Sequence, residues 1–359
     1  MIPFSGAGTL GSRTPLGVDP HSSCPSALAP MQDVTGLPFM KLVGSRGEPD
    51  MFFTEFFRVH ANSRLDPKIL TSVTENPTSR PVFAQLIGEN IEDIRRTVLE
   101  FKNFPVAGID LNMGCPAPRV YKKNVGGGLL KDPTKIDQIL STMRANWEGS
   151  LTVKMRIGFE DDHNFERILN VISKNRINLL SLHVRTVKGG YNTIPYYHYV
   201  EKAIELLGDD CPVLVNGSIE TAEDALSLKK RFGVFGVMIG RAAIRNPWIF
   251  RQIREISSGK SPVVPKRFDL HQYCIDLYNE LSHPLIEEKK MVSRMKKFLN
   301  YICLALRDDG IFLKQMRLAV TQKELFSVFD ANLLSGSKSN LDISSKPQAQ
   351  TLVPNPSLS

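Results

Sequence analysis

The residue best suited to chemistry in this sequence is Cys115, in the segment Asp110-Leu-Asn112-Met-Gly114-Cys115-Pro116. A lone cysteine is more often a small buried apolar residue, but Gly114 and Pro116 favour a tight loop that would leave this thiol exposed. A thiolate would be a nucleophile, whereas a protonated thiol would be an acid. Because no histidine lies in the loop to take the proton, a thiol with the ordinary pKa of about 8.5 is expected to stay protonated and to act as a proton donor.

Other distinctive residues stand within or at the ends of short apolar runs like the one that precedes Cys115. They are Met31, Gln85, Asn112, Lys154, His183, Arg185, Asn216 and Arg241. Lys154 lies inside an otherwise apolar run, and an unpaired buried ammonium is very costly. An anionic or electron-rich cofactor would supply the missing partner. The alternative is a structural salt bridge to an inward-facing carboxylate, for which Asp110 is the candidate.

Two of these runs end in glycine-containing segments of the kind that bind phosphate. The first is Asn216-Gly217-Ser218 and the second is Gly240-Arg241. Each glycine alone is more often a turn residue. At the ends of consecutive strands, however, their backbone N–H groups could face one phosphate, and the guanidinium of Arg241 would add a charge-assisted contact. The pair therefore predicts a site for a phosphorylated ligand.

The pattern of the chain predicts the scaffold that positions these residues. Eight apolar runs alternate with helical patterns such as 91–101, 133–144 and 222–231; the runs are approximately 27–31, 51–55, 81–87, 108–112, 151–157, 179–184, 212–216 and 236–240. Such alternation indicates parallel strands joined by helices. A closed (β/α)₈ TIM barrel is the simplest architecture, and it would gather these side chains at the C-terminal ends of its strands. An open doubly wound sheet is disfavoured because Ala29-Pro30-Met31 replaces the usual glycine fingerprint after its first strand.

The chain as a whole divides into four predicted parts. They are a flexible leader at 1–25, the α/β barrel at 26–260, a small C-terminal all-helical domain at 267–329, and a disordered tail rich in serine at 330–359. No apolar run is long enough to span a membrane, so a soluble cytoplasmic protein, expected to be monomeric, is predicted. The five cysteines are scattered and never in C-x-x-C spacing, which predicts neither disulfides nor a metal site.

Over roughly residues 27–255 the chain resembles the tRNA-dihydrouridine synthases. The motifs that carry the resemblance, in order and spacing, are Ala29-Pro30-Met31, Phe83-Ala-Gln85-Leu, Asp110-Leu-Asn112-Met-Gly-Cys115-Pro116, Val153-Lys154-Met-Arg156, His183-Val-Arg185-Thr, Val215-Asn216-Gly217, Met238-Ile-Gly240-Arg241-Ala and Asn246-Pro-Trp248. Two departures are visible, because Ser218 stands where the family often has Asp and because the first strand is short and preceded by Pro25.

The resemblance implies an FMN-bound barrel, with NADPH as the expected electron donor, and a helical domain that helps to hold tRNA. By this analogy the residues that contact the isoalloxazine are Pro30, Met31, Gln32 and Gln85, and Lys154 lies at its N1/O2 edge. The residues that hold the ribityl phosphate are His183, Asn216, Gly217, Ser218, Gly240 and Arg241. Asn112 and Arg185 would face the target uridine.

The chemistry implied for this family suits Cys115. The C5=C6 bond of uracil is conjugated to the C4 carbonyl, so hydride from reduced FMN would add at C6 and a proton would be needed at C5. Cys115 is the expected acid for that step. Because the target base lies inside folded RNA, it must leave its stack, which costs a few kcal/mol that contacts to the surrounding phosphates must offset.

A basic helical segment could supply such contacts. The protein has a net charge of +8, and nine basic residues stand against two acidic ones (Asp308 and Asp309) between positions 289 and 323: Lys289, Lys290, Arg294, Lys296, Lys297, Arg307, Lys314, Arg317 and Lys323. Met291, Met295, Phe298 and Ile302 form an apolar stripe on the same segment. A solvated helix face that binds nothing is the alternative, but the one-signed charge favours tRNA.

Two other functions stay open at this point. A flavin barrel that reduces free pyrimidines would use a similarly placed cysteine and would have no use for the basic helices. A non-catalytic RNA-binding barrel would carry no flavin and would be colourless when purified.

Overall fold

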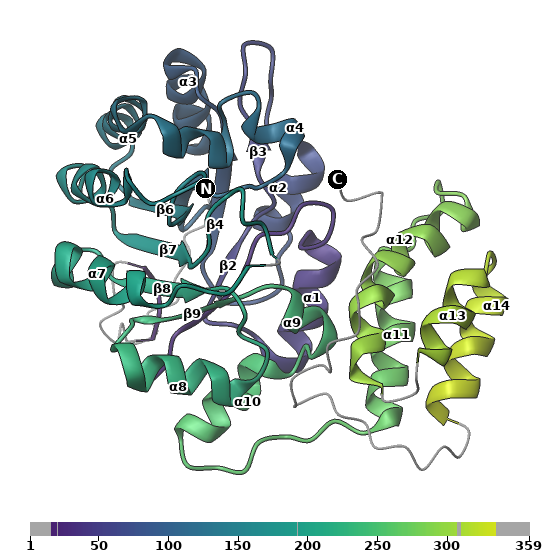
Figure 1. The fold of residues 1–359 in the computed structure, drawn as a ribbon. Coiled ribbons are helices and arrows are strands. Elements are labelled where there is room, and N and C mark those ends of the chain that lie inside the picture. Colours follow the sequence, from purple (N-terminus) through teal and green to yellow (C-terminus); the bar gives the residue numbers. More distant parts are fainter. Residues whose placement is uncertain (1–15, 20, 192, 307–309, 335–359) are drawn as a thin grey trace, which may run out of the picture.

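The computed structural model describes residues 16–19, 21–191, 193–306 and 310–334. Its centre is a closed barrel of eight parallel strands, as predicted (Figure 1). The strands are β1 (Ser26–Leu28), β2 (Met51–Phe53), β4 (Val82–Ile87), β5 (Gly108–Met113), β6 (Ser150–Arg156), β7 (Leu179–His183), β8 (Val213–Asn216) and β9 (Gly236–Ile239). Pairing of β2 with β4 and of β1 with β9 closes the ring.

Helices connect the strands around the outside of the barrel (Figure 1). They are α1 (Leu37–Gly47), α2 (Pro67–Thr74), α3 (Ile91–Phe101), α4 (Pro118–Tyr121), α5 (Pro133–Asn146), α6 (Phe165–Lys174), α7 (His198–Leu207), α8 (Ala222–Phe232), α9 (Arg241–Arg245) and α10 (Ile249–Ser257), with 3₁₀ turns at Gly126–Lys131 and Gly208–Asp210. Several begin at side-chain caps, such as Asn90 on α3 and Thr221 on α8, whose oxygens accept hydrogen bonds from backbone N–H groups of the first turn.

One short strand was not predicted. Strand β3 (Phe57–Arg58) follows β2 after a three-residue break and pairs with β4 at Leu86 and Ile87. Strand β2 pairs with β4 at Val82 and Phe83. β3 therefore continues the line of β2 toward the C-terminal end of the barrel. Two residues carry too little pattern to be recognised as a strand in the sequence.

The alternation of side chains along the strands divides the barrel interior into an apolar and a polar half. The apolar cluster at one end is Leu16, Val18, Ala27, Ala29, Met51, Phe53, Phe83, Leu179, Leu214 and Met238. Two residues further along the strands, the inward positions become polar: Gln85 is level with Asp110 and Thr152, and Asn112 is level with Lys154 and Ser181. The polar half lies toward the C-terminal ends of the strands, where barrel enzymes place their active sites.

Both predicted terminal boundaries need correction. Leu16, Val18 and Cys24 are buried, so within residues 16–19 and 21–25 the predicted flexible leader is anchored to the rest of the protein by these three side chains. At the other end, Asp330–Leu334 continue the last helix as a π-helical turn, with Leu333 buried, so these five residues are not a disordered tail. Residues 1–15 of the predicted leader and 335–359 of the predicted tail lie outside the described residues.

The C-terminal region is helical, as predicted. It comprises α11 (Arg267–Leu281), α12 (Glu288–Ile302), a 3₁₀ turn at Cys303–Ala305, α13 (Ile311–Leu318) and α14 (Gln322–Phe329). Figure 1 shows it, in green to yellow, beside α1 and α9 of the barrel. The rings of Phe39 and Phe298 lie 5.6 Å apart across this boundary, and the Tyr273 hydroxyl donates to the Ile244 carbonyl at 2.9 Å. The helical region is therefore packed tightly onto the barrel.

The apolar stripe predicted on α12 is confirmed: Met291, Met295, Phe298 and Ile302 are all buried. Its basic residues are not all free for a ligand. The Lys296 ammonium donates to the Arg317 carbonyl at 2.7 Å, Lys297 lies 3.9 Å from the Asp33 carboxylate, and Lys290 pairs with Glu287. Arg307, Asp308 and Asp309 lie outside the described residues. No helix in the part of the chain that the structure describes is both long and apolar enough to cross a membrane.

Candidate active site

The predicted site residues lie in the C-terminal half of a barrel strand or in the loop that follows it. Pro30, Met31 and Gln32 follow β1; Gln85 is in β4; Asn112 is in β5 and Cys115 follows it; Lys154 is in β6; His183 ends β7 and Arg185 follows it; Asn216, Gly217 and Ser218 are at the end of β8; Gly240 and Arg241 follow β9. Since the strands are parallel and form one ring, all of these residues are brought to the same end of the barrel.

Cys115 is held in a tight turn by the side chain of Asn112. The Asn112 Oδ1 atom accepts hydrogen bonds from the backbone N–H groups of Gly114 at 3.1 Å and Cys115 at 3.0 Å. The Cys115 carbonyl accepts from the Gly127 N–H at 3.2 Å, which ties the turn to the glycine-rich segment. Cys115 is half-buried against a small cluster of Phe56, Ile87 and Val120, and so is less exposed than its sequence suggested.

The surroundings of the thiol keep it protonated. Burial raises the pKa of Cys115, and this effect outweighs the opposing influence of the Ala117 backbone N–H and of the cations Arg156, Arg58 and Lys154. A thiol whose pKa lies above its ordinary value is a poor nucleophile at neutral pH but retains a proton to give. The environment therefore favours the acid over the nucleophile.

A buried chain of hydrogen bonds runs from the barrel interior to the Cys115 turn. The Thr152 hydroxyl and the Gln85 Nε2 donate to the two carboxylate oxygens of Asp110, at 2.6 and 2.7 Å. The Asn112 Nδ2 donates to the Gln85 Oε1 at 2.8 Å. Burial raises the pKa of Asp110 to about 6, although both hydrogen bonds and the charge of Lys154 act in the opposite direction. Asp110 thus orients Gln85, Gln85 orients Asn112, and Asn112 fixes the Cys115 turn.

Lys154 does not form the salt bridge that was the alternative to a cofactor contact. Its ammonium donates to the Asn216 Oδ1 at 3.1 Å, and no carboxylate of the described residues lies within ion-pair distance of it. Asp110 influences it only through space. Burial and the nearby Arg156 lower the pKa of Lys154 to about 8. This incompletely compensated buried cation is the state expected of a residue that receives an electron-rich ligand.

Several cations surround His183. Burial, followed by the charges of Arg156, Lys154, Arg185 and Arg241, lowers the pKa of His183 well below its ordinary value, so the imidazole is neutral. Among the described residues, the buried polar atoms without a hydrogen-bond partner include Ser181 Oγ and His183 Nδ1 on β7, Arg185 Nη1 just after it, and Gln32 Oε1 in the loop after β1. Unsatisfied buried polar atoms are rare in folded proteins. They are consistent with a bound polar, anionic group.

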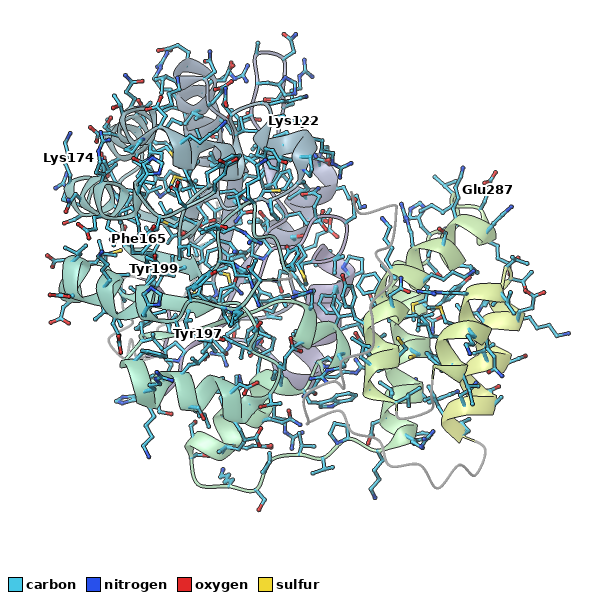
Figure 2. All side chains as sticks on the ribbon, in the orientation of Figure 1. Lys122, Phe165, Lys174, Tyr197, Tyr199 and Glu287 are labelled. Carbon is cyan, nitrogen blue, oxygen red and sulfur yellow. The ribbon has the colours of Figure 1, made fainter. Side chains whose placement is uncertain are left out.

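The backbone at Gly217 lies directly beside His183 and Arg185. Gly217 has φ +111°, and a Cβ atom there would lie 3.2 Å from His183 Nε2 and 3.4 Å from Arg185 Nη1. The next residue, Ser218, has a left-handed φ of +53°, and its hydroxyl accepts from Arg185 Nη2 at 2.6 Å. Tyr197, labelled in Figure 2, donates its hydroxyl hydrogen to the Gly217 carbonyl at 2.8 Å. Glycine is required here because a side chain would fill the space between backbone and cations.

The loop after β1 is also fixed in place. The Met31 N–H donates to the Thr35 hydroxyl at 2.8 Å, and a Cβ at Gly240 would lie 3.3 Å from the Met31 sulfur. Glu55, buried at the end of β2, accepts backbone hydrogen bonds from Asp33 and Val34, and burial raises its pKa. The loop after β1 thus lies beside Gly240, in the glycine segment that follows β9.

The prediction from sequence missed Arg156 and Tyr191 as site residues. Arg156 is buried and donates to the carbonyls of Gly114 at 3.1 Å, Thr186 at 2.8 Å and Gly190 at 2.7 Å, which links the Cys115 turn to the loop after β7. The Tyr191 ring lies 5.1 Å from the Arg156 guanidinium carbon and 4.5 Å from that of Arg241. A second buried charge two residues after Lys154 was a usable signal for Arg156, but Tyr191 lies in a loop without periodicity.

A family model described as dihydrouridine synthase (Dus) matches residues 27–334. The chain belongs to the dihydrouridine synthase family. The match spans the whole barrel and the helical region, and it includes the Cys115 turn and the two glycine segments.

Curated relatives agree with this assignment. The chain is 31% identical over 313 residues to a protein of Bacillus subtilis (strain 168) named "Probable tRNA-dihydrouridine synthase 2", covering 84% of this chain and 92% of the relative. It is 31% identical over 280 residues to a "Probable tRNA-dihydrouridine synthase" of Staphylococcus aureus (strain COL), covering 75% and 82%. A solved structure of a 2-naphthoyl-CoA reductase complex shares the fold, with a TM-score of 0.51 at 12% identity over 66% of this chain and 50% of that one.

Metal ligation was not predicted, and the described residues contain no group of three or more His, Cys, Asp or Glu side chains arranged to hold a metal ion. The candidate active site therefore consists of the Cys115 thiol, the buried hydrogen-bonded side chains that orient it, and a group of cations at the same end of the barrel as the two glycine segments.

Proposed function

We propose that this protein is a tRNA-dihydrouridine synthase that reduces the C5=C6 bond of uridines in tRNA to 5,6-dihydrouridine, using NAD(P)H by way of FMN. The observation that carries the proposal is the position of Cys115, a protonated half-buried thiol at the same end of the barrel as a group of uncompensated cations. Membership of the family supplies the substrate class.

The site fits FMN on its own residues. Gly217 lies close to His183 Nε2 and Arg185 Nη1, and Arg185 Nη1 and His183 Nδ1 have no hydrogen-bond partner among the described residues. Unpaired nitrogens beside a glycine backbone suit a phosphate dianion. The residues proposed to hold the phosphate are His183, Asn216, Gly217, Ser218, Gly240 and Arg241. Those proposed to contact the ring system are Pro30, Met31, Gln32, Gln85 and Lys154. The cation of Lys154 would stabilise negative charge on the reduced ring, and bound flavin would supply the hydride that uracil C6 must receive.

The chain itself performs the proton transfer. Hydride addition at C6 leaves the electron pair of the C5=C6 bond at C5, in conjugation with the C4 carbonyl, and the Cys115 thiol gives its proton to C5. The product is neutral and the thiol becomes a thiolate, which recovers a proton from solvent before the next turnover. The raised pKa of Cys115 matters twice, because the thiol is protonated before the step and is reprotonated readily after it.

The substrate residues have distinct proposed tasks. Asn112 holds the Cys115 turn through its Oδ1 atom, and its amide retains one N–H beyond the hydrogen bond to Gln85. Arg185 retains the unpartnered Nη1 for the uridine or the flavin phosphate. Four cations of the helical region have no partner among the described residues and are proposed to contact tRNA phosphates: the exposed Lys289, Lys314 and Lys323 and the half-buried Arg294.

Incubation of the purified protein with unmodified tRNA and NADPH, followed by nucleoside mass spectrometry, tests the proposal. Dihydrouridine should form in tRNA, and the protein should be yellow. Reduction of free uracil or uridine at an equal rate, with no change when the basic helical residues are reversed, would favour a free-pyrimidine reductase instead. A colourless protein that bound tRNA would favour the non-catalytic alternative.

A further inference from the structure

Arg58 stands at the end of the short strand β3, close to the Cys115 turn. Its register partner on β4 is Ile87, the last residue of that strand. Ile87 packs with Phe56 and Val120 in the cluster that supports Cys115. The charge of Arg58 also lowers the pKa of the Cys115 thiol, which places the guanidinium within electrostatic range of the sulfur.

The guanidinium is supported on one face and available on its edges. Its carbon lies 5.0 Å from the centroid of the buried Phe56 ring, a cation–π arrangement that leaves the N–H edges free. Arg58 is exposed, and among the described residues it forms neither an ion pair nor a hydrogen bond. Arg156, on the other side of the thiol, is instead fully engaged with three backbone carbonyls.

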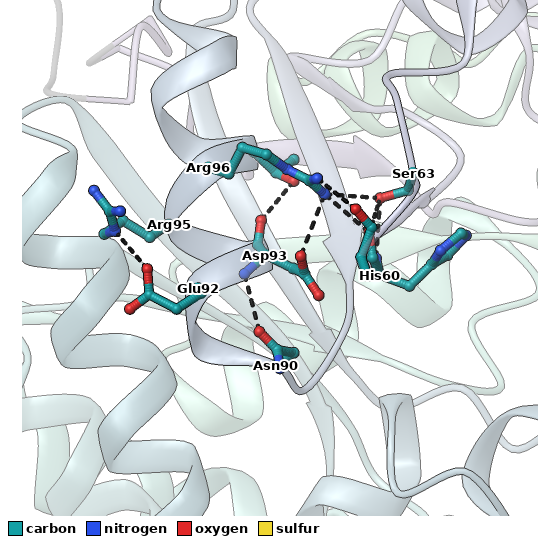
Figure 3. A network of polar contacts seen from close by, with 9 residues as sticks. His60, Ser63, Asn90, Glu92, Asp93, Arg95 and Arg96 are labelled. Carbon is teal, nitrogen blue, oxygen red and sulfur yellow. Dashed lines mark hydrogen bonds and ion pairs between the residues drawn. The ribbon is translucent and has the colours of Figure 1, made fainter.

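The loop that follows β3, around His60 and Ser63, is tied to α3, as Figure 3 shows. Arg96 donates to the Ala61 carbonyl at 2.7 Å and to the His60 carbonyl at 2.9 Å, and it lies 3.5 Å from the Asp93 carboxylate. The Val59 N–H donates to the Ile87 carbonyl at 2.9 Å. Arg58 is therefore presented from a rigid segment, which reduces the entropy lost when it binds a ligand.

The position of β3 separates Arg58 from the proposed flavin phosphate. Strand β3 pairs with β4, whereas the phosphate-type segments follow β8 and β9. On the eight-stranded ring β4 and β8 stand four places apart, so they lie on opposite walls of the barrel. Cys115 follows β5, next to β4. A ligand of Arg58 must therefore approach from the Cys115 side and cannot be the phosphate held by His183.

We infer that Arg58 binds a backbone phosphate of the RNA next to the target nucleotide, and so anchors the strand as the base enters beside Cys115. The inference rests on the proposed function. An exposed, preorganised guanidinium with free N–H edges matches the bidentate geometry of a phosphate, and a polyanion is the substrate expected at this end of the barrel. This contact would lie on the barrel, separate from the cations of α12–α14.

The test compares the full-length Arg58→Gln, Arg58→Lys and Arg95→Ala proteins, loaded with FMN, in their affinity for unmodified tRNA across a range of salt concentrations. Arg95 is an exposed arginine of α3 whose one ion-pair partner among the described residues is Glu92, so Arg95→Ala is the control. Arg58→Gln should weaken tRNA binding about tenfold and lower the slope of log affinity against log salt by about 0.7 to 0.9. Arg58→Lys should keep most of the salt slope, and Arg95→Ala should match the unmodified sequence.

Unchanged affinity and slope in Arg58→Gln would overturn the inference. A lower rate at saturating tRNA with unchanged affinity would also overturn it, because Arg58 would then act on the thiol. The binding measurement needs no turnover, so it stays decisive if the proposed function fails. Protein that binds tRNA but forms no dihydrouridine would refute the proposed function, while the slope would still report on Arg58.

Discussion

Replacing Asn112 with alanine should separate a positioning role from a substrate contact. The Asn112 side chain makes three hydrogen bonds, two of them accepted from the Gly114 and Cys115 N–H groups that shape the catalytic turn. If each of those two contributes about 1 kcal/mol, the correct turn loses about 2 kcal/mol relative to its alternatives. Since 1.4 kcal/mol corresponds to a factor of ten, the equilibrium ratio of the correct turn to its alternatives should fall about 30-fold.

The assay is single-turnover formation of dihydrouridine in saturating unmodified tRNA by pre-reduced enzyme. Asn112→Ala should lower this rate by up to about 30-fold while tRNA affinity changes little. The Gln85 Oε1 also loses its donor in a fully buried position, which should cost about 1–3 kcal/mol in the free energy of unfolding. Asn103→Ala, which removes an exposed asparagine side chain from the end of α3, is the control. An unchanged rate combined with weakened tRNA binding would refute the positioning role and restore Asn112 as a uridine contact.

Three further predictions concern the cofactor and the RNA. Lys154→Ala should reduce FMN occupancy, measured by the ratio of flavin to protein absorbance, more than it reduces the melting temperature; full retention would remove Lys154 from the site. Because the pKa of Lys154 is lowered to about 8, the cation is lost as pH rises through that value, so FMN affinity should fall above about pH 8 and the Lys154→Ala protein should lose this dependence. Charge reversal of Lys289, Arg294 and Lys314 in the helical region should weaken binding to all tRNAs alike and flatten the salt slope, while FMN is retained. The control is charge reversal of Lys102, Lys230 and Arg231, at the C-terminal ends of barrel helices α3 and α8, which should change neither the tRNA affinity nor the salt slope.

Much of the fold could be predicted because its signal is local. Buried parallel strands read as continuous apolar runs, and each expected run overlaps a barrel strand, with ends that agree or differ by up to three residues. Strand β3 and residues 16–25 could not be predicted this way. The first is only two residues long. In the second, Leu16 and Val18 are buried by contacts with strands distant in the sequence, which a composition rich in Gly, Ser and Pro does not reveal.

The candidate site was predictable where chemistry shows in a single residue type. Cys115 in its Gly-Pro loop and Lys154 in an apolar run are both conspicuous, and their shared location follows from the parallel barrel. The hydrogen-bond chain through Asp110, Gln85 and Asn112 was not predictable, because it depends on the register of neighbouring strands. The same limit applies to Arg58, whose importance appears only when β3 is seen beside Cys115.

The most direct test of the account is the Cys115→Ala protein, assayed for dihydrouridine formation in unmodified tRNA with NADPH. Loss of a general acid typically lowers a rate by about 10²–10⁴-fold. We expect a loss of this size, with FMN content and tRNA affinity unchanged and with the flavin still bleached by NADPH. Dihydrouridine formation at an undiminished rate, or failure of NADPH to bleach the flavin, would contradict the assignment of Cys115 as the proton donor.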